Sequence, residues 1–227
     1  MIKRKLSTSD IFTILINLVP LWGVLFNGWD PKQIFLIYCA ESIIVGLYNI
    51  LKMLIVTQVK PKDVWDEKTG TEVSGYFFIL FFIVHYGFFV AIQLMFFLGS
   101  SKIADTMNPI KALTVLPSLM DNYTRSLLWG FVGIYGLKMI IDFIFSGEFR
   151  RASMGLLMFS PYIRIFIQQF VVIVGGFFLT FGAGKIFMLV FVLVKIFFEV
   201  FINYERAISL TQRKQEIEIR ERNKNQL

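Results

Sequence analysis

The stretch GYFFILFFIVHYGFFVAIQLMFFL, residues 75–98, decides the class of the fold. It contains no Asp, Glu, Lys or Arg, and about 20 mostly apolar residues are enough for one transmembrane helix. The whole chain has the same character, because 56% of its 227 residues are hydrophobic and only 17% are charged. Soluble domains are about 45–50% apolar and about 25% charged. The sequence therefore predicts a helical membrane protein.

Five more apolar segments predict spans on either side of this one. The six predicted spans are residues 10–26, 31–56, 75–98, 125–146, 161–181 and 185–204. We expect a polar loop between the second and third spans. Where Pro109 and Pro117 interrupt the next connection, we expect a short helix at the surface. Residues 147–160 are expected to connect the fourth and fifth spans, also at the membrane surface.

The predicted fold class is all-α, a polytopic membrane helix bundle with six transmembrane helices. The six-span domain covers residues 1–205, and a charged cytoplasmic tail, helical or disordered, covers residues 206–227. Of the 23 Lys and Arg residues, 14 lie on the side that carries both ends, 5 lie on the other side and 4 lie in or beside spans. Because Lys and Arg gather in cytoplasmic loops, we expect both termini in the cytoplasm and the spans in the cell (inner) membrane.

Counting along the spans places three ionisable side chains at one depth. Glu41, His85 and Lys195 each lie ten residues after the predicted start of a span. At a rise of about 1.5 Å per residue, that is the middle of a hydrocarbon core about 30 Å thick. Charged groups at this depth are costly and usually mark function. These three residues are therefore the candidates for binding a substrate or an ion.

A second polar layer is predicted about one turn further inward. It consists of Lys138, Glu199, Asn17, Gln168 and Gln169. Because Lys195 and Glu199 are four residues apart, they can also neutralise each other on one helix face as a structural pair. Glu41 has no Lys or Arg within four residues on its own helix, so it needs a partner from elsewhere. The sequence leaves open which acid holds Lys195, and His85 also fits a neutral core histidine.

Three short stretches carry a family resemblance. YCAESIIVGLYNILKM, FFIVHYGFF and LVKIFFEV resemble a family of small prokaryotic multi-pass membrane proteins of unknown function. The shared features are a Glu in the second span, His-Tyr-Gly in the third and a Lys in the last. The resemblance covers most of the membrane part and leaves out the tail. It implies the fold and these positions, and it implies no activity.

Known catalytic and metal-binding motifs are missing from the sequence. The chain has one Cys, Cys39, and one His, which is too few for an all-protein zinc or iron–sulfur site. It has no P-loop, no G-x-S-x-G and no H-E-x-x-H. We therefore expect no metal and no cofactor. An enzyme is disfavoured, although unfamiliar chemistry around the three candidate residues stays open.

Three functions follow from these residues. The favoured one is a transporter or channel for a small solute or ion, with Glu41, His85 and Lys195 as its midplane site. The alternatives are an intramembrane enzyme and a lipid-binding or sensing membrane protein that use the same residues. The expected partners are membrane lipid and a small solute or ion, and not nucleic acid, because most of the +7 net charge lies beside the apolar segments. A pore would require a homo-oligomer, since six short helices do not enclose one alone.

Overall fold

The computed structural model of the chain describes residues 8–66, 70–101, 108–162, 165–166, 169 and 181–201. These residues are mostly helical, as predicted. In chain order the elements are α1 (Thr8–Phe26), α2 (Pro31–Val59), β1 (Lys62–Asp66), β2 (Thr71–Ser74), α3 (Gly75–Ser101), α4 (Pro109–Leu119), α5 (Asn122–Lys138), η1 (Met139–Phe145), η2 (Glu148–Arg150) and α7 (Gly184–Phe201). Residues 154–162 form a further helix between η2 and α7.

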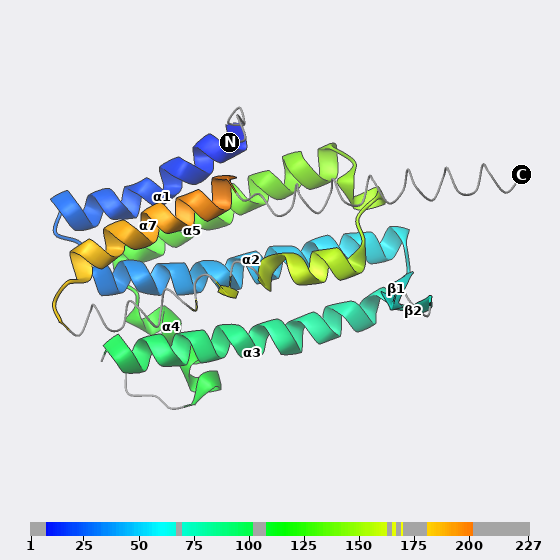
Figure 1. Ribbon diagram of the computed structural model, residues 1–227, viewed down its shortest axis with the longest axis horizontal. Coiled ribbons are helices and arrows are strands. Elements are labelled where there is room, and N and C mark those ends of the chain that lie inside the picture. The colour runs from blue at the N-terminus through cyan, green and yellow to red at the C-terminus, as the bar shows by residue number, and fades with distance from the viewer. Residues whose placement is uncertain are drawn as a thin grey trace, which may run out of the picture.

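Helix α2 lies at the centre of the bundle. In Figure 1 the helices α1, α7 and α5 lie on one side of α2 and α3 lies on the other. The start of α2 is fixed by Asp30, whose side chain accepts a hydrogen bond from the Lys32 backbone N–H at 2.9 Å, and by Pro31 in the first turn. Residues 34–42 of α2 are all buried. A helix that is buried on all sides is apolar all round, which is why this segment shows no amphipathic pattern.

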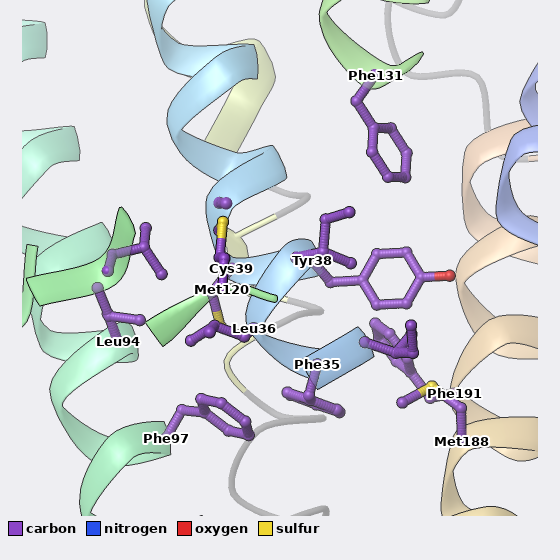
Figure 2. Close-up of a cluster of buried hydrophobic side chains, with 14 of the residues drawn as sticks. Phe35, Leu36, Tyr38, Cys39, Leu94, Phe97, Met120, Phe131, Met188 and Phe191 are labelled. Atoms are coloured by element: carbon purple, nitrogen blue, oxygen red, sulfur yellow. The ribbon is translucent and has the colours of Figure 1, made fainter. Parts of the chain in front are cut away.

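Aromatic side chains fill the core between α2 and its neighbours. Phe35 stacks on Phe97 of α3, with ring centroids 4.9 Å apart. The Tyr38 ring meets the edge of Phe191 of α7 at 4.8 Å. Figure 2 shows the Tyr38 ring extending away from α2, with Phe131 on one side of it and Phe191 on the other. These contacts join α2 to α3, α5 and α7 in one apolar cluster.

Three helices have the length and composition of membrane spans. Within the described residues, Pro31–Val59, Gly75–Gly99 and Asn122–Phe145 are long and apolar enough to cross a membrane. They coincide with the predicted second, third and fourth spans. Large apolar side chains such as Leu80 and Trp129 remain exposed, at 63% and 73%, as expected of surfaces that face lipid. Most of the predicted fifth span and the predicted tail lie outside the described residues.

The structure differs from the sequence prediction in three places. The expected polar loop before α3 is an antiparallel hairpin, in which Lys62 pairs with Ser74. The end of the fourth span is a π-helix, η1, that continues α5. The expected surface connection over residues 147–160 is already helical from residue 154, so the fifth helix begins earlier than predicted. The short helix predicted around Pro109 and Pro117 is present as α4.

Candidate functional site

A buried ion pair joins two helices that are distant in sequence. The ammonium of Lys195 on α7 lies 2.9 Å from Oε2 of Glu41 on α2 and 3.1 Å from its Oε1. The exposed fraction of the side chain is 4% for Lys195 and 0% for Glu41. Among the side chains that the structure describes, Glu41 contacts Lys195 across the bundle. The side chain of Glu199 lies outside the described part of the chain.

Two more helices supply polar groups to this pair. Lys195 donates to Oδ1 of Asn17 on α1 at 2.6 Å. The hydroxyl of Tyr135 on α5 donates to Oε1 of Glu41 at 2.7 Å. We call these four residues, Asn17, Glu41, Tyr135 and Lys195, the buried centre. Each of its members comes from a different helix, so the centre holds α1, α2, α5 and α7 together.

Aromatic rings surround the ammonium of Lys195. It lies 4.8 Å from the ring centroid of Tyr38 and 5.7 Å from that of Phe131, both within the range of a cation–π interaction. The Tyr38 hydroxyl in turn donates to the backbone carbonyl of Asn17 at 3.3 Å. The rings exclude water while they still stabilise the positive charge. The pair thus lies in an apolar shell, where electrostatic attraction is much stronger than in water.

His85 lies away from this centre, among aromatic rings between α3 and the helix at residues 154–162. Its Nδ1 is 2.6 Å from the hydroxyl of Tyr162, and its ring stacks on Phe81 at 5.1 Å. Its side chain is exposed, whereas Glu41 and Lys195 are buried. The structure therefore brings two of the three predicted midplane residues together and puts the third in a different environment. Equal depth along a helix does not fix the direction in which a side chain points.

The predicted inner layer is only partly visible in the described residues. Asn17 contacts Lys195 directly and belongs to the buried centre, because a long Lys side chain reaches about one turn along the bundle. Lys138 lies at the end of α5, with its ammonium 5.9 Å from the Tyr135 ring centroid. Gln169 is half-buried, and Gln168 lies outside the described residues.

Tyr135 and Tyr38 are members of the site or its shell that the sequence interpretation missed. A signal for Tyr135 was available, because it lies ten residues after the predicted span start at residue 125. That is the offset that selected Glu41 and Lys195. The count was applied to charged residues and histidine only, and a tyrosine in an aromatic-rich chain did not stand out. No comparable signal marks Tyr38, since its role depends on which helices pack together.

Other polar features lie elsewhere in the described residues. A pocket opens at the turn between α1 and α2, lined by residues that include Trp29, Asp30, Gln33, Asp121 and Tyr123. No group of three or more His, Cys, Asp or Glu side chains in the described part of the chain is placed to hold a metal ion. The buried centre is therefore the strongest candidate site, and its chemistry is that of an ion pair with a hydroxyl and an amide attached.

Comparison with known proteins identifies the family of the chain and assigns it no function. The model of a family of unknown function, DUF6498, matches residues 2–225. No curated protein and no solved structure matches the chain. A match over nearly the whole chain agrees with the expected membership of an uncharacterised family. It assigns no role to the buried centre.

Proposed function

The chain belongs to the DUF6498 family, a family of unknown function, and we propose that it is a membrane transporter or channel for a small solute or ion, with the buried centre as its working site. It works in the cell membrane as a six-span protein with both termini in the cytoplasm. The observation that carries the proposal is the fully buried Glu41–Lys195 pair, bound by side chains from two further helices. His85 is not part of this proposed site.

The energetics of such a pair argue for a role beyond stability. Removing two charges from water costs several kcal/mol for each ion, and their mutual attraction often returns no more than that. An apolar pair of similar volume usually stabilises a core as well or better. Ionisable groups inside transmembrane segments are rare and commonly mark the path of a substrate or ion. A pair that is expensive to keep in the middle of two spans therefore favours function.

The packing divides the four helices of the buried centre into two pairs. Helix α1 packs mainly on α7, and α2 packs closely on α5, while contacts between these two helix pairs are fewer. Lys195 and Asn17 belong to the first pair of helices, and Glu41 and Tyr135 belong to the second. The ion pair thus bridges the two helix pairs, and the proposed transport requires these to move relative to each other. Alternating access in transporters commonly uses such movement around a fixed site.

An intramembrane enzyme is less well supported by the same contacts. Serine chemistry would need a base beside Ser42, which is buried on α2. The Ser42 hydroxyl is 3.5 Å from the carbonyl of Tyr38, whereas His85 is bonded to Tyr162. The lipid-binding or sensing alternative has no specific contact in its favour. Transport therefore remains the function that the buried centre supports best.

The test is charge movement by the reconstituted protein. Vesicles on a solid-supported membrane receive concentration jumps of protons, Na⁺, K⁺, Cl⁻, acetate and glycine as probes. We expect at least one probe to produce a transient current that is lost in Glu41→Gln and in Lys195→Met. Because each single variant leaves one buried charge without its partner, the double variant is measured beside them. Thermal unfolding in detergent checks that each variant is folded.

Two exposed positions provide matched controls. Glu72→Gln on β2 and Lys111→Met on α4 remove the same charges from exposed side chains, so they should leave the current unchanged. Currents of wild-type size in folded Glu41→Gln and Lys195→Met would mean that the pair is structural. A wild-type protein that moves none of the probes would count against transport.

A further inference from the structure

The buried centre is filled by its own side chains. Asn17 and Glu41 have 0% of their surface exposed, and Lys195 has 3%. The rings of Tyr38 and Phe131 occupy the space beside the ammonium. The pocket at the α1–α2 turn is lined by none of these residues. A solute or a hydrated ion needs volume next to the group that binds it, but a proton needs only a hydrogen bond. The geometry of the centre in the described residues thus suits a proton.

Tyr135 connects the buried carboxylate of Glu41 to the partly exposed surface of α5. Its side chain is half-buried, in contrast to the fully buried Glu41. Its hydroxyl donates to Oε1 of Glu41 at 2.7 Å. A phenol oxygen has one proton to donate and lone pairs that accept, so it can accept from a proton carrier while it donates to Glu41. Tyr135 is therefore placed as a link between the carboxylate and the less enclosed side of α5.

We propose that the proton is the ion that the buried centre moves, and that the hydroxyl of Tyr135 relays it to Glu41. This inference rests on the proposed transport function. In the relay step a water-borne proton binds the Tyr135 oxygen while the original phenolic proton passes to Oε1 of Glu41. One O–H bond breaks on the hydronium ion that carries the proton, which leaves as water. On Tyr135 one O–H bond breaks and one forms, and on Glu41 one O–H bond forms. The phenol is regenerated, and the carboxylate has become a neutral acid.

Protonation of Glu41 changes the balance of charge at the centre. The pair goes from zero net charge to one positive charge, held by Asn17 Oδ1 at 2.6 Å and by the aromatic rings. The electrostatic attraction between Lys195 and Glu41 is lost, so the contact between α1–α7 and α2–α5 weakens. Proton uptake thus acts on the bridge between the two helix pairs, which is the change that a coupled transporter requires.

Other polar groups face the centre from the helices packed around it. Lys195 faces Glu41 from α7 and Asn17 approaches from α1. From α3, the Tyr86 hydroxyl donates to the backbone carbonyl of Ser42 at 2.9 Å. The ammonium of Lys138 lies 5.9 Å from the ring centroid of Tyr135 and faces it from the same helix. The half-buried hydroxyl of Tyr135 lies 2.7 Å from Oε1 of Glu41, which is close enough for proton transfer.

The experiment measures proton uptake by reconstituted vesicles that contain a pH-sensitive dye. A pH gradient is imposed and the membrane potential is clamped with K⁺ and valinomycin. Tyr135→Phe keeps the ring and removes the hydroxyl, and we expect proton uptake to slow by about 10²-fold, the usual effect of losing a proton-transfer group. Tyr48→Phe is the matched control, because Tyr48 also bridges α2 and α5 but donates to the Val132 carbonyl at 2.9 Å. It should transport at the wild-type rate.

Infrared difference spectra give a second readout that does not depend on transport. Acidification of the wild-type protein should produce a carboxylic-acid C=O band that is absent in Glu41→Gln. In Tyr135→Phe the band should shift, because Glu41 has lost a hydrogen bond, and it should form more slowly after a pH jump. A purely structural role for Tyr135 would not slow the protonation of Glu41.

The outcomes separate the relay from the wider proposal. Equal proton uptake in wild type, Tyr135→Phe and Tyr48→Phe would overturn the relay. Currents with Na⁺, K⁺, Cl⁻, acetate or glycine but not with protons would overturn the proton as the moving ion and leave transport standing. Silence with every probe would overturn transport, and the relay with it.

Discussion

The side chain of Lys195 shows how residue-scale geometry joins helices that are distant in sequence. Its own helix offers an acid four residues away, a spacing that suits a surface pair. In the structure the ammonium reaches across the bundle to Glu41 at 2.9 Å, while the side chain of Glu199 lies outside the described residues. A surface pair on one helix would stabilise by a few tenths of a kcal/mol. A pair that links two helices inside an apolar shell can change how those helices pack when either charge is neutralised.

Gly46 gives the sharpest prediction at the residue scale. A Cβ at this position of α2 would lie 2.6 Å from Cε1 of Tyr86. The Tyr86 ring is held by its hydrogen bond to the Ser42 carbonyl, so it cannot easily move aside. Gly46→Ala should therefore lower the free energy of unfolding by about 1–3 kcal/mol, the usual effect of overpacking. Thermal unfolding of the purified protein in detergent measures this.

Gly87 on α3 is the control for that substitution. Nothing lies within 4 Å of a Cβ built on Gly87, so Gly87→Ala should keep the stability or raise it by up to about 1 kcal/mol through helix propensity. If the two alanine variants unfold at the same temperature, α2 and α3 do not approach each other closely at Gly46.

At the scale of elements, the sequence predicted helices much better than their contacts. The spans over residues 31–56, 75–98 and 125–146 correspond to α2, α3 and α5 with η1, because apolar length alone defines them. Counting residues gives depth along a helix, so it placed Glu41 at the same depth as Lys195. It gives no information on direction around the helix axis, and so it did not separate His85, whose ring contacts Tyr162, from the other two. That direction depends on tertiary packing, which a single sequence does not show.

The hairpin was missed for a different reason. Its strands are only a few residues long and mostly polar, and short strands carry little periodic signal. Yet it makes a contact that no pattern predicts. Oδ2 of Asp63 on β1 accepts a hydrogen bond from the backbone N–H of Met154 at 2.7 Å. This carboxylate therefore caps the helix at residues 154–162 from a distant part of the chain.

Asp63 provides the prediction at this scale. The side chain is buried, and its Oδ1 also accepts from the ammonium of Lys60 at 2.9 Å. Asp63→Ala leaves the Met154 N–H, at the start of the helix, without this acceptor and should lower stability by about 1–2 kcal/mol, as loss of an N-cap does. Hydrogen–deuterium exchange of residues 154–157 should become faster. Glu72→Ala, at an exposed position on β2, should leave that exchange unchanged, and equal exchange in both variants would contradict the capping role.

At the scale of the whole molecule, the direction of the helices constrains the number of spans. Helix α7 runs from the end of the bundle where α1 meets α2 back toward the end where α1 begins (Figure 1). Three helices in the described residues have the length and composition of spans. The predicted count of six adds α1, α7 and the helix that begins at residue 154. An even count is what the direction of α7 favours, because an odd count places the two ends on opposite sides.

Reporter fusions in a bacterial host test the count and the orientation together. A green fluorescent protein fused after the last residue should fluoresce, and an alkaline phosphatase at the same point should be inactive, because we expect that end in the cytoplasm. Fusions in the α1–α2 turn, after Trp29, should give the opposite pair of results. Fusions at Gly70, in the turn of the hairpin, should behave like the C-terminal ones. The reason is that one span, α2, separates Gly70 from the α1–α2 turn. Active phosphatase both at the C-terminus and in the α1–α2 turn would require an odd number of spans. The buried pair would then need another arrangement of α7, because Lys195 reaches Glu41 only when α7 lies beside α1 and α2.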